Sequence, residues 1–121
     1  MPGLIKNLLS GDRQVSYRSA YALGQIGEAA VPELIKLLSS SSSKARAAAA
    51  RSLSWIKPPP PAAIGPLIET LGDSDKTVNR NASEALGSYG KAAAPALAKA
   101  LGAAEPVTRR GAARALKLMR S

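Results

Sequence analysis

The sequence predicts an all-α protein, a right-handed α-solenoid of four two-helix repeats that form a single domain over residues 1–121. Internal repetition is the first reason. A motif that begins with Leu-Ile in three copies and with Leu-Ala in the fourth keeps offsets of 30, 33 and 30 residues, starting at Leu4, Leu34, Leu67 and Leu97. A second motif keeps the same offsets, starting at Leu23, Leu53, Leu86 and Leu116. Within each unit the apolar residues step by three and four, which is the period of an α-helix.

Each unit is expected to hold two helices, with units near residues 2–27, 28–57, 58–90 and 91–121. Prolines are expected in the first turn of a unit's first helix, where a missing N–H costs little, at Pro32, Pro66 and Pro95. Asp12 and Asp75 supply N-caps for second helices, and Gly27 and Gly90 end them. We expect the run of prolines at 58–61 to form a stiff extended link, and the serines at 39–43 to lengthen a turn.

The composition argues against most catalytic chemistry. The chain has no His and no Cys, which removes imidazole acid–base catalysis, thiolate chemistry, disulfides and the usual zinc ligand sets. The one close pair of acids, Asp73 and Asp75, precedes a helix, where capping explains it. We therefore expect a protein that is not an enzyme and uses no cofactor. No apolar run approaches the roughly 18 residues of a membrane span, so we expect a soluble, cytoplasmic protein with no membrane partner.

The unit pattern Val-Pro-x-Leu-Ile-x-Leu-Leu, then a turn, then Val-x-x-x-Ala-x-x-Ala-Leu-Gly resembles the HEAT-repeat family. It is most similar to the short HEAT-like repeats found in phycobilin lyases, and residues 31–38 and 81–87 carry the resemblance best. The resemblance specifies the fold better than the function. It also implies a ladder of turn aspartates and second-helix arginines, of which this chain keeps a fragment: Asp73 would face Arg46 or Arg109, in a structural role.

The whole net charge of +9 is expected on one face of the solenoid. The first helices and their turns carry equal numbers of bases and acids: Lys6, Lys36, Lys91 and Lys99 against Glu28, Glu33, Glu69 and Asp73. The second helices and the turns before them therefore hold the excess of bases. The resemblance implies that these second helices line the concave side.

Helical spacing places the residues two and six positions after each second helix's Val position on an exposed face. In chain order these residues are Tyr17 and Tyr21, Ala47 and Arg51, Arg80 and Glu84, and Arg110 and Arg114. They form a stripe of arginines with aromatic residues at one end. The predicted partner-binding residues are Tyr17, Tyr21, Arg46, Arg51, Trp55, Arg80, Arg109, Arg110, Arg114 and Lys117.

The repeat alignment predicts different environments for Tyr89 and Trp55. Tyr89 occupies the position of Ile26, so we expect it in the core. Trp55 aligns with Gln25 and Ser88, at a position expected to be exposed. It is therefore either a partner contact or a side chain that folds over the proline link.

Three interpretations of the basic stripe remain open at this point. It is a solvated charged face, a docking surface for an acidic protein segment, or a nucleic-acid surface. We favour a non-enzymatic HEAT-like scaffold that binds an acidic partner protein. The alternatives are nucleic-acid binding through the same stripe, or a role as a subunit of a larger HEAT-like assembly such as a pigment lyase or its chaperone. Uncapped solenoid ends also predict self-association.

Overall fold

The computed structural model describes residues 2–119 and, over that range, contains eight α-helices and no strand. The predicted all-α solenoid is confirmed. The helices form four consecutive pairs: α1 (Pro2–Leu8) with α2 (Arg13–Ile26), α3 (Val31–Leu37) with α4 (Ser43–Ser54), α5 (Pro61–Thr70) with α6 (Lys76–Tyr89), and α7 (Ala94–Ala100) with α8 (Pro106–Met119). Short 3₁₀ segments, Gly27–Ala30 and Gly90–Ala92, connect α2 to α3 and α6 to α7.

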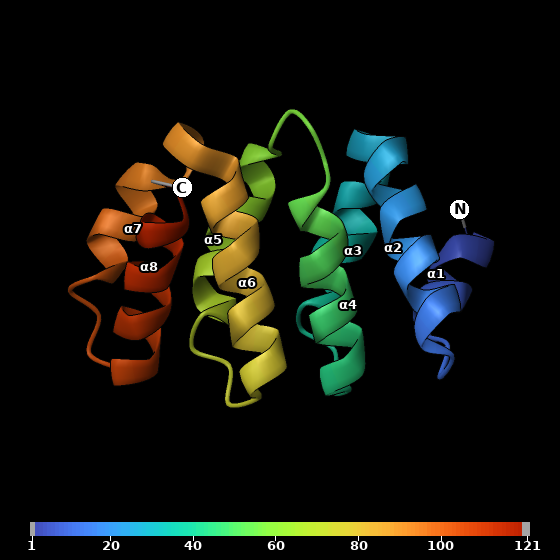
Figure 1. Cartoon of the computed structure of the whole chain (residues 1–121), viewed down its shortest axis with the longest axis horizontal. Coiled ribbons are helices and arrows are strands. Elements are labelled where there is room, and N and C mark those ends of the chain that lie inside the picture. Colours follow the sequence, from blue (N-terminus) through green and yellow to red (C-terminus); the bar gives the residue numbers. More distant parts are fainter. Residues whose placement is uncertain (1, 120–121) are drawn as a thin grey trace.

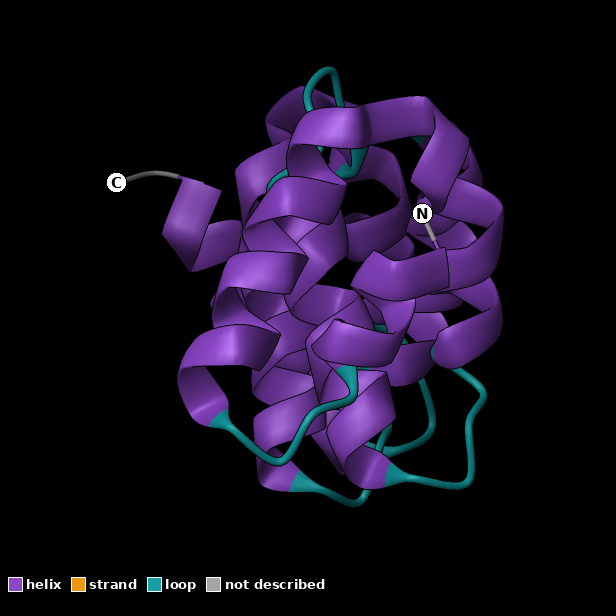
Figure 2. Cartoon of the chain, turned by 90° about the vertical axis from the view of Figure 1, so that its right-hand side faces the viewer, coloured by secondary structure: helices purple, strands orange, loops and turns teal. Residues whose placement is uncertain are grey.

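The pairs stack side by side in two rows (Figure 1). The second helices α2, α4, α6 and α8 form the front row of that view, and the first helices lie behind them. The turns within the pairs gather at one end of the molecule (Figure 2). Neighbouring second helices pack against each other far more extensively than neighbouring first helices do. The second helices are also the longer ones, so this row makes most of the contact between units. We call the surface that the second helices form the concave surface, after the side to which the HEAT-repeat resemblance assigns them.

The repeated leucines build the core. Leu34, Leu67 and Leu97 of the first motif are fully buried, as are Leu23, Leu53 and Leu86 of the second. Alanines fill the space between the helices, and this allows the helices to approach closely. The repeat that was visible in the sequence is therefore the packing repeat of the solenoid.

Tyr89 belongs to this core, as predicted. Its side chain is 4% exposed, and its hydroxyl donates a hydrogen bond of 2.9 Å to the carbonyl of Leu53 in the preceding unit. Burial raises the pKa of the Tyr89 hydroxyl above its usual range. The contact links α6 to α4 with a satisfied polar group.

The predicted ends of the second helices are confirmed where caps were expected. Asp12 accepts hydrogen bonds from the backbone N–H groups of the first turn of α2, and Asp75 does the same for α6. Ser42 caps α4 from within the serine run. Gly27 and Gly90 follow α2 and α6 with φ of 76° and 60°, a backbone conformation that favours glycine.

The prediction for Pro66 is wrong. The helix α5 begins at Pro61, so Pro66 lies inside it rather than in its first turn. A proline suits the first position of a helix, because its φ is helical and the N–H that it lacks would have no partner there. Pro61 can therefore begin α5 five residues before Pro66. The extended part of the proline link is correspondingly shorter and ends at Pro60.

Within residues 2–119, no helix combines the length and the apolar character needed to cross a bilayer.

Candidate interaction surface

Arg46 forms the predicted ladder contact with Asp73. Its Nε lies 2.7 Å from Asp73 Oδ2 and its Nη2 lies 3.3 Å from Oδ1, while Nη1 donates to the carbonyl of Ser40. The two side chains are 19% and 12% exposed. The hydrogen bond to Asp73 raises the pKa of Arg46. Arg46 therefore joins α4 to the turn of the next unit.

Arg109 has the equivalent position in the last unit and a similar local role. Its Nη1 donates hydrogen bonds of 2.8 Å to the carbonyls of Ala103 and Ala104, in the turn before α8. Asn79 likewise donates to the carbonyl of Asp73. The residues at this repeat position hold the turn of their own unit, and Arg109 is exposed while Arg46 is half-buried.

Four other predicted residues form one aromatic cluster, which we define as Tyr17, Tyr21, Arg51 and Trp55. The ring of Trp55 lies with its centroid 5.2 Å from that of Tyr17 and 5.7 Å from that of Tyr21. The guanidinium carbon of Arg51 lies 4.9 Å from the centroid of the Tyr17 ring, within cation–π range. Tyr17 and Tyr21 are 50% and 54% exposed, so this cluster presents aromatic surface to solvent.

Trp55 is half-buried because the preceding unit makes room for it. Gly24 of α2 lies against the end of α4, where a Cβ added at Gly24 would come within 2.8 Å of Trp55 Cβ. Gly87 and Leu118 repeat this contact between α6 and α8. Trp55 thus fills a seam between units and lies against the tyrosines of α2.

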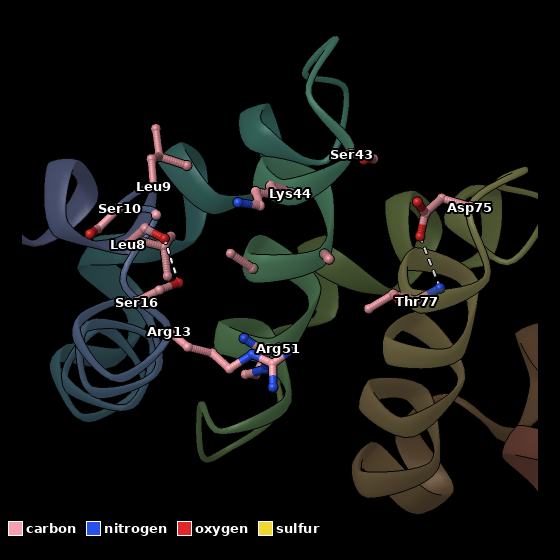
Figure 3. A pocket seen from close by; sticks show the side chains of 13 residues that line it. Leu8, Leu9, Ser10, Arg13, Ser16, Ser43, Lys44, Arg51, Asp75 and Thr77 are labelled. Atoms are coloured by element: carbon pink, nitrogen blue, oxygen red, sulfur yellow. Dashed lines mark hydrogen bonds between the residues drawn. The ribbon is translucent and has the colours of Figure 1, made fainter.

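A first hollow of about 450 Å³ lies at the ends of the second helices nearest the turns. Three basic side chains line it, Arg13 of α2 and Lys44 and Arg51 of α4, and Asp75 is also part of its lining. Figure 3 shows Arg13 and Arg51 extending toward the same part of this hollow from their two helices. Ala47 contributes little side chain at the position that arginine occupies in α6 and α8, which leaves the space open.

A second hollow of about 600 Å³ lies between α6 and α8. Four basic side chains line it: Lys76, Arg80, Arg110 and Arg114. Two acids also line it, Asp73, which is paired with Arg46, and Glu105. Arg80, Arg110 and Arg114 therefore share one surface, as the stripe requires.

Side-chain hydrogen bonds join α4 and α6 along their middle and C-terminal parts, whereas near the turns the first hollow extends to Asp75 and Thr77 at the start of α6. The side-chain amide of Asn81 donates to the carbonyl of Ala47 at 3.0 Å, and Ser88 donates to the carbonyl of Ser54 at 3.2 Å. Lys57 donates to the carbonyl of Ser88. The concave surface consequently has two basic hollows rather than one uninterrupted stripe.

Sequence reasoning missed three of the lining bases, Arg13, Lys44 and Lys76. Arg13 and Lys76 directly follow the N-caps of α2 and α6, and Lys44 is the second residue of α4. The signal was a base immediately after the capping residues Asp12 and Asp75. Of the predicted residues, Lys117 is exposed on α8 and lines neither hollow.

Two rows of paired helices with an inner row of second helices define a helical repeat protein of the α-solenoid class. A family model described as HEAT repeats matches residues 1–64 and 58–117. The chain belongs to the HEAT-repeat family, which confirms the predicted resemblance.

Solved structures support this assignment. The chain is similar to a structure titled as the complex of CpcE and CpcF of phycocyanin lyase from Nostoc sp. PCC7120, with a TM-score of 0.73 and 27% identity over 98% of this chain and 77% of the other. Two engineered proteins are each 28% identical with a TM-score of 0.51, over 97% and 98% of this chain and 61% and 37% of theirs. No curated protein matches the chain.

Proposed function

We propose that this protein is a non-enzymatic HEAT-repeat scaffold that binds an acidic segment of a partner protein on its concave surface. The observation that carries the proposal is the second hollow. Arg80, Arg110 and Arg114 reach it from two neighbouring helices. Over residues 2–119 the structure has a single ion pair, between Arg46 and Asp73, so these three arginines have no acidic partner within that range.

The aromatic cluster favours a protein as the partner. Arginine and aromatic side chains supply a large share of binding energy at protein interfaces, because they bury much area and lose little conformational entropy. Tyr17, Tyr21 and Trp55 offer such anchors next to Arg51. The similar structure from Nostoc is titled as a complex of two proteins, which also supports a protein partner.

Fluorescence anisotropy tests this proposal. Labelled glutamate-rich peptides and labelled single-stranded and double-stranded oligonucleotides are titrated at two salt concentrations. We expect the acidic peptide to bind and the triple variant Arg80→Ala, Arg110→Ala, Arg114→Ala to lose that binding. Tighter binding of an oligonucleotide, with a steep dependence on salt, would replace the protein partner by nucleic acid.

The chain offers a matched control for total charge. Lys36, Lys91 and Lys99 are exposed on the first-helix side, outside both hollows. Their triple change to Ala removes the same three charges. An equal loss of binding in this control would show that net charge alone attracts the peptide, and would contradict a concave site.

A second candidate function is that of a subunit in a larger assembly of HEAT-repeat proteins. The observation that favours it is the similarity to the CpcE–CpcF complex over 98% of this chain. Size-exclusion chromatography of this protein mixed with purified CpcE or CpcF tests it. A shared peak that elutes ahead of either component supports the assembly, and separate peaks oppose it.

We also propose weak self-association. Leu9, Val15 and Ile26 of the first unit and Leu101 and Leu118 of the last unit are each about two fifths exposed. Exposed apolar surface on the terminal units of a solenoid favours contact with another apolar surface.

A further inference from the structure

We infer that the concave surface is a two-point site that selects an extended acidic segment with two separate acidic clusters, one for each hollow. This inference rests on the proposed function and makes it more specific. A uniform basic stripe would accept any run of acidic residues. Two separate groups of bases bind best a segment whose acidic clusters are the same distance apart as the two groups.

Basic residues in the first turns of three second helices indicate that the hollows bind anions. Arg13, Lys44 and Lys76 lie in the first turns of α2, α4 and α6, and the first turns of these helices contain no acidic residue. A cation in the first turn opposes the helix dipole and typically costs about 0.3–1 kcal/mol in an exposed site. Helix stability therefore does not explain these three positions, whereas the bases themselves would attract an anion. The helix N-termini add nothing to this attraction, because side chains of this chain, Asp12, Ser42 and Asp75, already cap them.

The surface between the hollows is unsuited to an anion. Asp75 gives the first hollow an acidic edge on the α6 side, and Glu84 occupies the stripe position of α6 that Arg51 and Arg114 occupy in α4 and α8. Glu84 is exposed. An acidic side chain placed there would meet like charge, so the segment that crosses α4 and α6 should be neutral.

The repeat sets the distance between the two points. The bases of the first hollow lie on α2 and α4 and those of the second lie on α6 and α8, so the two groups of bases are on average two helix spacings apart along the row. Packed helices lie about 8–10 Å apart, which gives a separation of about 20 Å. An extended chain rises about 3.3 Å per residue, so about six residues span that distance.

Two peptides of equal composition and one shorter peptide test the inference. The first carries two triplets of glutamate separated by six Gly/Ser residues. The second carries the six glutamates in one run, with the six Gly/Ser residues after them. A third carries one triplet and the spacer only. We expect the separated peptide to bind at least about tenfold more tightly than the single triplet, because the second contact is intramolecular, and more tightly than the run.

Variants assign each triplet to a hollow. The double variant Lys44→Ala, Arg51→Ala removes two positive charges from the first hollow. The double variant Arg80→Ala, Arg110→Ala removes two from the second. Each pair should reduce the affinity for the separated peptide to that of the single triplet. The exposed pair Lys36→Ala, Lys99→Ala, on the other side of the solenoid, should leave the preference for the separated peptide unchanged.

The outcomes separate the two claims. Equal or tighter binding of the uninterrupted run overturns the two-point site and leaves an acidic-segment surface in place. Failure of all three peptides to bind at low salt overturns the proposed function and the two-point site together. Circular dichroism of each variant confirms that it keeps its helices.

Discussion

Asp73 connects three parts of the chain. Its carboxylate receives hydrogen bonds from Arg46 of the preceding unit and from the backbone of Asp75, and its carbonyl receives one from Asn79. Since these contacts belong to one network, removing one partner leaves the others poorly satisfied. This residue explains how the surviving fragment of the ladder couples the second unit to the third.

Substitution of this pair should give non-additive losses. Asp73→Ala and Arg46→Ala should each lower the urea midpoint of unfolding, and the double variant should lose less than the sum of the two. Equilibrium urea unfolding followed by circular dichroism measures all four proteins of the cycle. Strictly additive losses would mean that the ion pair contributes nothing to the coupling of the units.

The burial of Tyr89 should make the free energy of unfolding depend on pH in the alkaline range. The pKa of Tyr89 is raised in the folded state by burial, whereas the pKa of a tyrosine in the unfolded chain is about 10. Its contribution to stability is therefore fully present below about pH 10 and is lost as the pH rises above it, because only the unfolded chain then releases the proton. The free energy of unfolding of the wild type should fall more steeply above about pH 10 than that of Tyr89→Phe.

The Tyr89→Phe variant has its own cost at neutral pH. It leaves the buried carbonyl of Leu53 without this donor, and the expected loss is about 1 kcal/mol. Urea unfolding at pH 7 and at several values between pH 9 and 11 measures both effects. Parallel curves for the two proteins above pH 10 would contradict the buried, protonated tyrosine.

At the scale of helices, glycine seams set how closely the units approach. Gly24 lies against Trp55, and a Cβ there would come 2.8 Å from Trp55 Cβ and 3.3 Å from its backbone carbon. Gly24→Ala should therefore destabilise the protein by about 1–3 kcal/mol through overpacking. Gly3→Ala is the control, because nothing lies within 4 Å of a Cβ at Gly3, and it should be neutral or slightly stabilising.

Thermal unfolding of both glycine variants makes this comparison. The fluorescence of Trp55 adds a local measurement, because a displaced α2 would change the surroundings of the only tryptophan in the chain. Equal melting temperatures for Gly24→Ala and the wild type would show that the seam can widen without cost.

Much of the fold could be predicted because the same apolar spacing recurs in all four units and capping residues mark several helix ends. The leucine offsets located the helix pairs, and Asp12 and Asp75 marked helix starts. The family resemblance left Arg46 and Arg109 as the two candidate partners of Asp73, and the structure pairs it with Arg46. Pro66 could not be placed, because Pro61 and Pro66 can each begin a helix and only the packing of α5 decides between them.

The surface was harder to predict than the helices. Sequence spacing brought Arg80, Arg110 and Arg114 together on one face. It could not show that Trp55 would lie on the tyrosines of α2, since that contact depends on the gap at Gly24 in another unit. It also missed the division into two hollows, which depends on side-chain size between helices.

At the scale of the whole molecule, the exposed apolar residues of the terminal units predict self-association. Sedimentation velocity should show a sedimentation coefficient that rises with protein concentration. The double variant Ile26→Ser, Leu101→Ser should remain a monomer, because it removes two side chains that are each 43% exposed. A wild type that sediments as a monomer at every concentration would contradict this expectation.

NMR chemical-shift mapping can locate the surface that binds the acidic segment. The ¹⁵N-labelled protein is titrated with the peptide that carries two separated glutamate triplets. The account predicts saturable shifts at residues of α2, α4, α6 and α8 that line the two hollows, with α3, α5 and α7 little affected. Shifts centred on the first helices, or an absence of saturable shifts at low salt, would contradict it.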